Sequence, residues 1–314
     1  MRISTNLILM GLIATSFIGC RSRDEQANSL MKALGNSVVQ PQKIGDAIVI
    51  GDTNLTGNRN VEGGLPKFTQ TSFAPRSDVF LSRKQFVIYY NVKAKVPAWT
   101  AWQVVKSDLG EQTRSNRFRS DDILNNFMRA KERVNGVSSD DYGGTCFDRG
   151  HQAASADRSN SREDNEATYF MSNMAPQTAF LNERIWADLE KHTRKLVEEK
   201  DVKIQVYAGP IMKDGRDGIG PDKDIQVPES FFKVLAIYPN KSAKKPTEYI
   251  AVIMPNATSN GLDPVANHEV TCKEQDKGGT GRLSTNWEDY RVKLKDIETK
   301  AGVSFPGLAE LRDM

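Results

Sequence analysis

Apolar positions follow a strand-like pattern in five segments of the chain. Each segment is rich in β-branched and aromatic residues, which is typical of β-strands. The segments are residues 84–95, 97–105, 202–211, 231–239 and 248–256. The first two are expected to form a hairpin, and a short strand ended by proline is expected within residues 166–176.

Two other segments have helical patterns. In residues 179–200 one face carries the apolar side chains Leu181, Ile185, Leu189 and Leu196, which predicts an amphipathic helix. A short helix closed by Gly302 is expected within residues 284–302. Strands and helices come in mixed order, so we expect an α+β fold with a mixed or antiparallel central sheet flanked by helices.

The connections between these elements are polar. Residues 120–165 are expected to be mostly irregular, because Asp, Gly, Ser and Arg dominate them. Residues 209–228 read as a long connection rich in Gly, Pro and Asp, and His268 lies in a loop-like stretch. No function is assigned to His192 or His268.

The N-terminus has the pattern of an export signal. Arg2 precedes the apolar run Leu7–Ile18, which is too short for the roughly 20 residues that span a membrane. Gly19-Cys20 after such a run resembles the cleavage site of bacterial lipoproteins, with Cys20 as the lipid-bearing residue, although Phe17 departs from the usual leucine. We expect residues 1–19 to be removed, and a plainly secreted protein is the alternative.

Residues 20–63 are predicted to be a polar tether, because they are rich in Gly and Asn with only short apolar runs. The folded domain is expected to occupy residues 64–314. The net charge of +3 permits an anionic partner but does not require one.

Cys146 and Cys272 remain if Cys20 carries a lipid. In an oxidising compartment they can form a disulfide that closes a long loop, worth about 4 kcal/mol by the chain-entropy estimate. The alternative is two unpaired buried thiols. Metal binding by so few and so widely spaced cysteines is not expected.

Two segments carry residues suited to chemistry. Asp148, Arg149 and His151 lie in a turn-forming stretch, DRGH. On the helix of residues 179–200, Glu190 and Arg194 lie about 80° and 120° from Asn182 around the axis. One broad face can therefore present an amide oxygen, a carboxylate and a guanidinium beside the histidine, which suits phosphodiester hydrolysis.

Each of these residues also has a purely structural interpretation. His151 can be a hydrogen-bonded turn residue, and Asn182 can cap the helix near which it lies. Glu190 and Arg194 are four residues apart, the spacing of an ordinary surface ion pair worth about 0.3–0.5 kcal/mol.

The segments FDRGHQAASADR and TYFMSNMAPQTAFLNERIWADLE resemble the DNA/RNA non-specific endonuclease family of the ββα-metal, or His-Me finger, superfamily. The similarity runs over roughly residues 64–308. It implies an α+β fold with a ββα-metal finger as the active site. It also implies a nuclease that cleaves DNA and RNA with little sequence preference.

The resemblance further implies roles for single residues. His151 would be the general base, and Asn182 would be the direct ligand of one Mg²⁺, or of Mn²⁺ in its place. Glu190 would orient metal-bound water, Arg149 would contact the phosphate, and Arg194 would stabilise its charge.

Two neighbouring residues would have supporting roles. Asp148 is expected to support the backbone of the site rather than to react. Asn173 either holds the histidine loop or serves packing. The sequence QAAS after DRGH departs from the family pattern, which puts substrate contacts near Gln152 in doubt.

The expected function is degradation of DNA and RNA outside the cytoplasm by a lipid-anchored or secreted Mg²⁺-dependent endonuclease. The alternative is a surface lipoprotein that keeps the nuclease scaffold only to bind nucleic acid or a protein partner. A toxin exported against competitors would share the chemistry and would be expected to have an inhibitor protein.

Overall fold

The computed structural model describes residues 42–44, 47–69, 79–277 and 281–312. The predicted export signal, with Cys20, lies outside these residues. Within them, every helix is either too short or too polar to cross a membrane.

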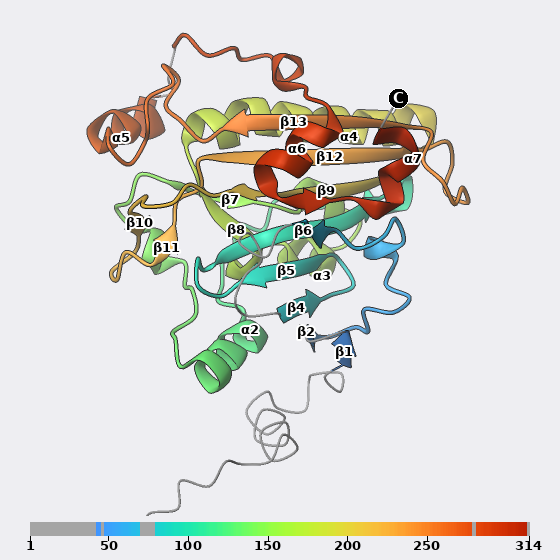
Figure 1. The fold of residues 1–314 in the computed structure, drawn as a ribbon, viewed down its shortest axis with the longest axis horizontal. Helices are drawn as coiled ribbons and strands as arrows, with labels where there is room; N and C mark the ends of the chain where they lie inside the picture. The colour runs from blue at the N-terminus through green and yellow to red at the C-terminus, as the bar shows by residue number, and fades with distance from the viewer. Residues whose placement is uncertain (1–41, 45–46, 70–78, 278–280, 313–314) are drawn as a thin grey trace, which may run out of the picture.

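An eight-stranded sheet forms the centre of the molecule (Figure 1). Its order is β1-β2-β4-β5-β6-β9-β12-β13, and each neighbouring pair is antiparallel except β2 and β4, which are parallel. The strands are β1 (Gln42–Ile44), β2 (Ala47–Gly51), β4 (Val79–Ser82), β5 (Val87–Asn91), β6 (Val96–Val104), β9 (Lys203–Ile211), β12 (Ser230–Tyr238) and β13 (Glu248–Pro255).

Three two-stranded sheets lie outside the central one. They pair β7 (Asp148–His151) with β8 (Met174–Gln177), β3 (Lys67–Phe68) with β14 (Val303–Ser304), and β10 (Gly218–Ile219) with β11 (Ile225–Gln226).

The helices are mostly short. The α-helices are α2 (Asp122–Phe127), α3 (Arg162–Ala167), α4 (Ala187–Lys200), α5 (His268–Lys277), α6 (Leu294–Ala301) and α7 (Ala309–Arg312). Two segments are π-helical, Met128–Glu132 and Leu181–Trp186, and the second continues directly into α4. Short 3₁₀ turns occur at Arg59–Val61, Lys106–Asp108, Asp140–Tyr142, Ser155–Arg158, Met171–Asn173, Trp287–Tyr290 and Pro306–Leu308.

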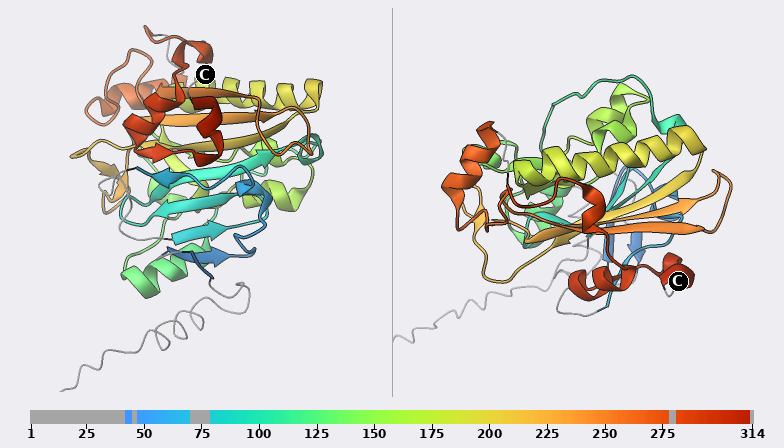
Figure 2. Two further views of the ribbon diagram at one scale, coloured as in Figure 1. Left: turned by 45° about the vertical axis from the view of Figure 1, so that its right-hand side comes forward. Right: turned by 90° about the horizontal axis from the view of Figure 1, so that it is seen from above.

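The central sheet is covered on both faces. Helix α4 lies on one face and α6 on the other, as the view along the sheet shows (Figure 2). Along β12 the side chains alternate, so that Phe231 and Leu235 pack in the cluster with α4, whereas Phe232 and Val234 pack in the cluster with α6. Because both faces are covered, every residue of β9 is buried, including the polar Lys203 and Gln205.

The α+β architecture predicted from the sequence is confirmed, with the β5–β6 hairpin and the long helix among its elements. The strand expected within residues 166–176 begins later, at Met174, because a helix end and a 3₁₀ turn occupy the residues before it. Residues 120–165 are more ordered than expected. Their two short helices begin where the side chains of Asp121 and Ser161 accept hydrogen bonds from backbone amides.

Residues 47–63, predicted to belong to a tether, are part of the fold. Strand β2 pairs with β4, and Ile50 is buried in the core. The side chain of Asn60 is fully buried, where it donates to the Lys84 carbonyl and accepts from the Gln103 amide. The polar composition of this segment therefore serves buried hydrogen bonds rather than a solvated linker.

Candidate active site

Strands β7 and β8 followed by α4 form the expected ββα finger on one face of the sheet. Strand β7 carries the DRGH segment, and its Gly150 pairs with Ala175 of β8. A Cβ at residue 150 would collide with the side chain of Gln177, which is fully buried and has no room to move. A glycine is therefore required between the arginine and the histidine.

His151, at the end of β7, lies in an aromatic environment. The side chains of Phe118 and Tyr169 pack against the imidazole, with ring centroids 5.7 and 4.8 Å away. The residue is 7% exposed, and its Nε2 has no hydrogen-bond partner among the described residues. Burial, with a smaller contribution from the positive charge of Arg114, lowers the pKa of His151 from 6.5 to about 3. The imidazole is thus neutral at pH 7.

This pKa predicts how stability depends on pH. Between pH 6.5 and about 3 the unfolded chain binds a proton at residue 151 that the folded chain does not bind. The free energy of unfolding should therefore fall as the pH drops through this range, and this loss should be absent above pH 6.5. Urea unfolding measured at pH 7 and at pH 5 should show that the free energy of unfolding falls more for the wild type than for His151→Gln. An equal fall in both proteins would contradict the assignment.

Asn173 holds the chain that follows His151. Its side chain is fully buried, accepts from the Ala153 amide and donates to the carbonyls of Ala153 and Thr168. Its own carbonyl accepts from the Gln152 amide. Of the two roles expected for Asn173, the structure shows the first, since it fixes the backbone on the far side of the histidine. Gln152 itself is fully buried and does not line the site.

Asn182 lies in the π-helical turn before α4. Such turns are rare and frequently occur at functional sites. The Asn182 side chain donates from Nδ2 to Oδ2 of Asp148 over 2.9 Å. The other oxygen of Asp148 accepts from Nε2 of Gln275 over 3.2 Å. Asp148 therefore orients side chains, which corrects the expectation that it supports the backbone.

A cavity of about 400 Å³ lies in front of these groups. Its wall includes the side chains of Arg114, Phe118, Asp148, Arg149, Asn182 and Gln275. The guanidinium of Arg149 lies over the Phe118 ring at 4.5 Å from its centroid. Phe118 contributes to the wall and His151 does not, so the ring screens the imidazole from the cavity. A larger cavity of about 530 Å³, between residues 55 and 65, includes none of the predicted site residues.

Glu190 and Arg194, predicted for the same face as Asn182, do not line this cavity. Glu190 pairs with the buried Lys233 at 3.3 Å, and Arg194 pairs with the buried Asp157 at 3.0 Å.

The pair of Glu190 and Lys233 is packed among aromatic rings. The ammonium of Lys233 lies 3.9 Å from the centroid of Trp186, and burial lowers its pKa. Burial raises the pKa of Glu190, although the charge of Lys233 acts to lower it. Trp186 also donates its indole N–H to the carbonyl of His151 over 3.2 Å. The ion pair therefore stabilises the indole that holds the end of β7.

The residues around Asn182 fit a hard divalent cation. Nδ2 of Asn182 is held by Asp148, which leaves Oδ1 without a hydrogen bond to any described residue and available as a ligand. Amide and carboxylate oxygens suit Mg²⁺, which keeps several waters and tolerates few protein ligands. The amide oxygen and the open cavity beside it meet that requirement.

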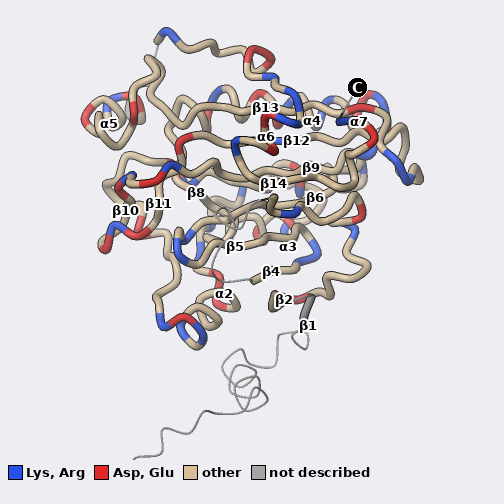
Figure 3. Tube along the Cα trace, in the orientation of Figure 1, with Lys and Arg blue, Asp and Glu red and all other residues tan. Residues whose placement is uncertain are grey.

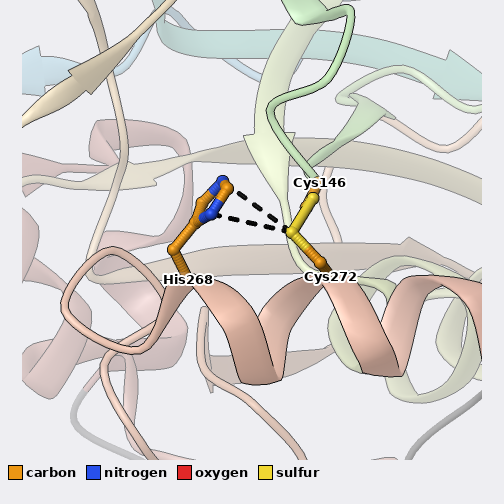
Figure 4. Close-up of side chains that lie close together, drawn as sticks. All are labelled: Cys146, His268 and Cys272. Atoms are coloured by element: carbon orange, nitrogen blue, oxygen red, sulfur yellow. Dashed lines mark hydrogen bonds between the residues drawn. A yellow bond between two sulfur atoms is a disulfide. The ribbon is translucent and has the colours of Figure 1, made fainter.

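A second cluster of potential ligands comprises Cys146, His268 and Cys272, whose ligand atoms lie within 4.8 Å of one another. Cys146 and Cys272 form a disulfide, so the predicted pair is present and the alternative of free thiols is wrong. Figure 4 shows His268 beside the bonded sulfurs. Because the disulfide occupies both sulfurs, this cluster is a cross-link and not a metal site.

Four residues of this region were not found from the sequence. Arg114 and Phe118 come from an irregular segment, and Gln275 comes from a helix that the pattern did not indicate. Lys233 did leave a signal, since it is the charged residue inside the apolar run FFKVLAI. Over the trace as a whole, basic and acidic positions are intermixed (Figure 3). The cavity wall likewise carries both signs of charge, with Arg114 and Arg149 beside Asp148 and Glu183.

Comparisons with known proteins identify the family of this chain. A family model described as DNA/RNA non-specific endonuclease matches residues 66–308. A nuclease of Nostoc is 30% identical over 243 residues, which cover 76% of this chain and 76% of that protein. A nuclease of Serratia marcescens is 27% identical over 207 residues, or 64% of this chain and 73% of that one.

Solved structures show the same fold. In a crystal structure of the EndoG/EndoGI complex, one chain superposes with a TM-score of 0.59 at 20% identity and covers 83% of this chain and 95% of that one. Since the family model matches most of the sequence, this chain belongs to the DNA/RNA non-specific endonuclease family of hydrolases.

Proposed function

We propose that the chain is a divalent-cation-dependent endonuclease that hydrolyses DNA and RNA without reading base sequence, with His151 as general base and Asn182 as the protein ligand of one Mg²⁺ or Mn²⁺. The observation that carries the proposal is the Asn182 amide, fixed through Nδ2 by Asp148 with its oxygen free beside the cavity.

The side chains at the cavity have complementary tasks. Arg149, and Arg114 at the same wall, donate to phosphate oxygens, which are common to all nucleotides. His151 accepts the proton of the attacking water. An anionic phosphate in the cavity raises the low pKa of the imidazole, because the opposite charge favours the imidazolium. Phe118 must turn away from His151 for this to happen.

When bound, the cation supplies Lewis-acid stabilisation of the charge that develops on the phosphate and the leaving oxygen. Asn182 holds it through Oδ1. Glu190 and Arg194 act less directly in this proposal than the resemblance implies, since each is engaged in an ion pair behind the finger.

Digestion of plasmid DNA and of RNA by the chain from residue 47 onward tests the proposal. Chelation of divalent cations should abolish cleavage. Asn182→Ala should raise the Mg²⁺ concentration that gives half-maximal activity by at least about 10–100-fold, since even groups that only orient a ligand have effects of that size.

The matched control is Asn160→Ala, an exposed asparagine outside the cavity, which should behave as the wild type. Tight binding of nucleic acid without product, with Mg²⁺ present, would instead support the catalytically retired lipoprotein. Cleavage that survives chelation would refute the role of Asn182.

We also propose that the enzyme acts outside the cytoplasm, anchored through a lipid on Cys20 or secreted. The apolar run before Cys20 and the disulfide support this, because disulfides persist in oxidising compartments. Fractionation of cells that express the Cys20→Ser chain distinguishes the anchored form from the secreted one. If the enzyme serves as a toxin it also needs an inhibitor protein, for which the EndoG/EndoGI complex is a precedent.

A further inference from the structure

Helix α5 stands at the edge of the molecule, beyond the end of the central sheet (Figure 1). Its sequence, HEVTCKEQDK, has no apolar stripe. Among its residues with described side chains, only Thr271 is buried, and that side chain bonds to the carbonyls of Pro264 and Asn267 just before the helix. Most helices in proteins are stabilised by packing an apolar face, and α5 lacks one.

One face of α5 is instead attached to the chain that leads into β7. His268, Cys272 and Gln275 have the i, i+4, i+7 spacing of a single helical face. They contact three nearly consecutive residues. His268 Nε2 lies 3.2 Å from the Thr145 carbonyl oxygen, Cys272 is bonded to Cys146, and Gln275 donates to Asp148. Figure 4 shows the first two side chains of this face turned toward the Cys146 segment.

Two hydrogen bonds connect Gln275 to Asn182, the proposed ligand of the cation. Gln275 donates to Oδ1 of Asp148, and Oδ2 of Asp148 accepts from Nδ2 of Asn182. With both oxygens engaged, the carboxylate of Asp148 is held in one plane. The orientation of the Asn182 amide, and hence the direction of its free oxygen, depends on that plane. Gln275 also lines the cavity itself.

We propose that Gln275 is a positioning residue for the divalent cation, and that the Cys146–Cys272 disulfide tethers α5 so that Gln275 stays on Asp148. This inference rests on the proposed function of Asn182. It assigns α5 a role in the affinity for the cation rather than in the chemical step. The disulfide thereby helps to position residues of the active site.

Titration of the metal-free, full-length protein with Mn²⁺ by calorimetry tests the first half. Gln275→Leu should raise the dissociation constant for Mn²⁺ by about 10–100-fold, the usual effect of losing a group that orients a ligand. Its melting temperature without metal should stay that of the wild type, because the disulfide remains. In cleavage assays the Mg²⁺ requirement should rise, whereas kcat at saturating Mg²⁺ should change little.

Lys273→Ala is the matched control, since Lys273 is exposed on the same helix and pairs with Glu269. It should bind Mn²⁺ as the wild type does. Gln275→Leu binding Mn²⁺ as tightly as Lys273→Ala would overturn the inference. A wild type that binds no Mn²⁺ would overturn the cation site itself, which is a separate outcome.

The doubly substituted chain Cys146→Ser/Cys272→Ser tests the tether. Folded at low temperature, it should show the same loss of Mn²⁺ affinity as Gln275→Leu, and adding Gln275→Leu should weaken binding no further. Wild-type affinity in the folded double variant would refute the tether. If that variant does not fold, titration of the folded wild type with Mn²⁺ after reduction of the disulfide tests the tether, and unchanged affinity would refute it.

Discussion

His151→Ala lowers kcat on plasmid DNA and on RNA by about 10²–10⁴-fold, the range expected when a general base is lost. The reason is that the imidazole is neutral and its Nε2 has no hydrogen-bond partner among the described residues, so it can accept a proton once an anionic phosphate raises its low pKa. Binding of nucleic acid should persist, because Arg149 and Arg114 remain at the cavity. Single-turnover cleavage and a gel-shift assay measure the two effects separately.

His192→Ala is the control for this substitution. His192 lies on α4 against Trp287 and does not line the cavity. It should retain wild-type kcat. If His151→Ala cleaves at the wild-type rate, the general base is another group and the assignment is wrong.

Lys233→Met destabilises the fold by about 3–5 kcal/mol, the cost of removing one partner from a buried ion pair. The side chain of Lys233 is 1% exposed and that of Glu190 is 17% exposed, so the carboxylate left behind has little access to water. The ammonium also leaves the face of Trp186, whose indole holds the His151 carbonyl. Urea unfolding measures the loss.

The control is Lys195→Met, on α4, the helix that also carries Glu190. Lys195 and its partner Glu199 are both largely exposed, and such pairs contribute about 0–1 kcal/mol. The double variant Lys233→Met/Glu190→Gln should recover part of the lost stability, since no unpaired charge remains. Equal stabilities for Lys233→Met and Lys195→Met would show that the buried pair has no such role.

Five of the eight strands of the central sheet, β5, β6, β9, β12 and β13, were predictable because their apolar patterns record burial, whereas β1, β2 and β4 were not predicted. Strands β9 and β12 are covered on both faces and are mostly apolar. Helix α4 was predictable from its apolar stripe. Helix α5 was not, because a disulfide and polar contacts hold it and leave no periodic apolar signal.

The residues of the site also fall into those that the sequence indicated and those that it did not. The DRGH strand and the turn that carries Asn182 are each one continuous stretch of sequence, so both were found as motifs. Arg114 and Phe118 reach the cavity from an irregular segment about thirty residues earlier, and no local pattern marks them. Glu190 and Arg194 do not line the cavity because they pair with Lys233 and Asp157, partners that the local sequence did not indicate.

The cross-link between residues 146 and 272 also determines what a single cut in the chain would do. The disulfide closes a covalent ring of chain that contains the strands β7 to β13. The turn at residues 213–217, which is largely exposed, is part of that ring. A single peptide-bond cut at this turn would open the ring without separating the two pieces. Strands β9 and β12, on either side of the nick, would remain parts of one molecule.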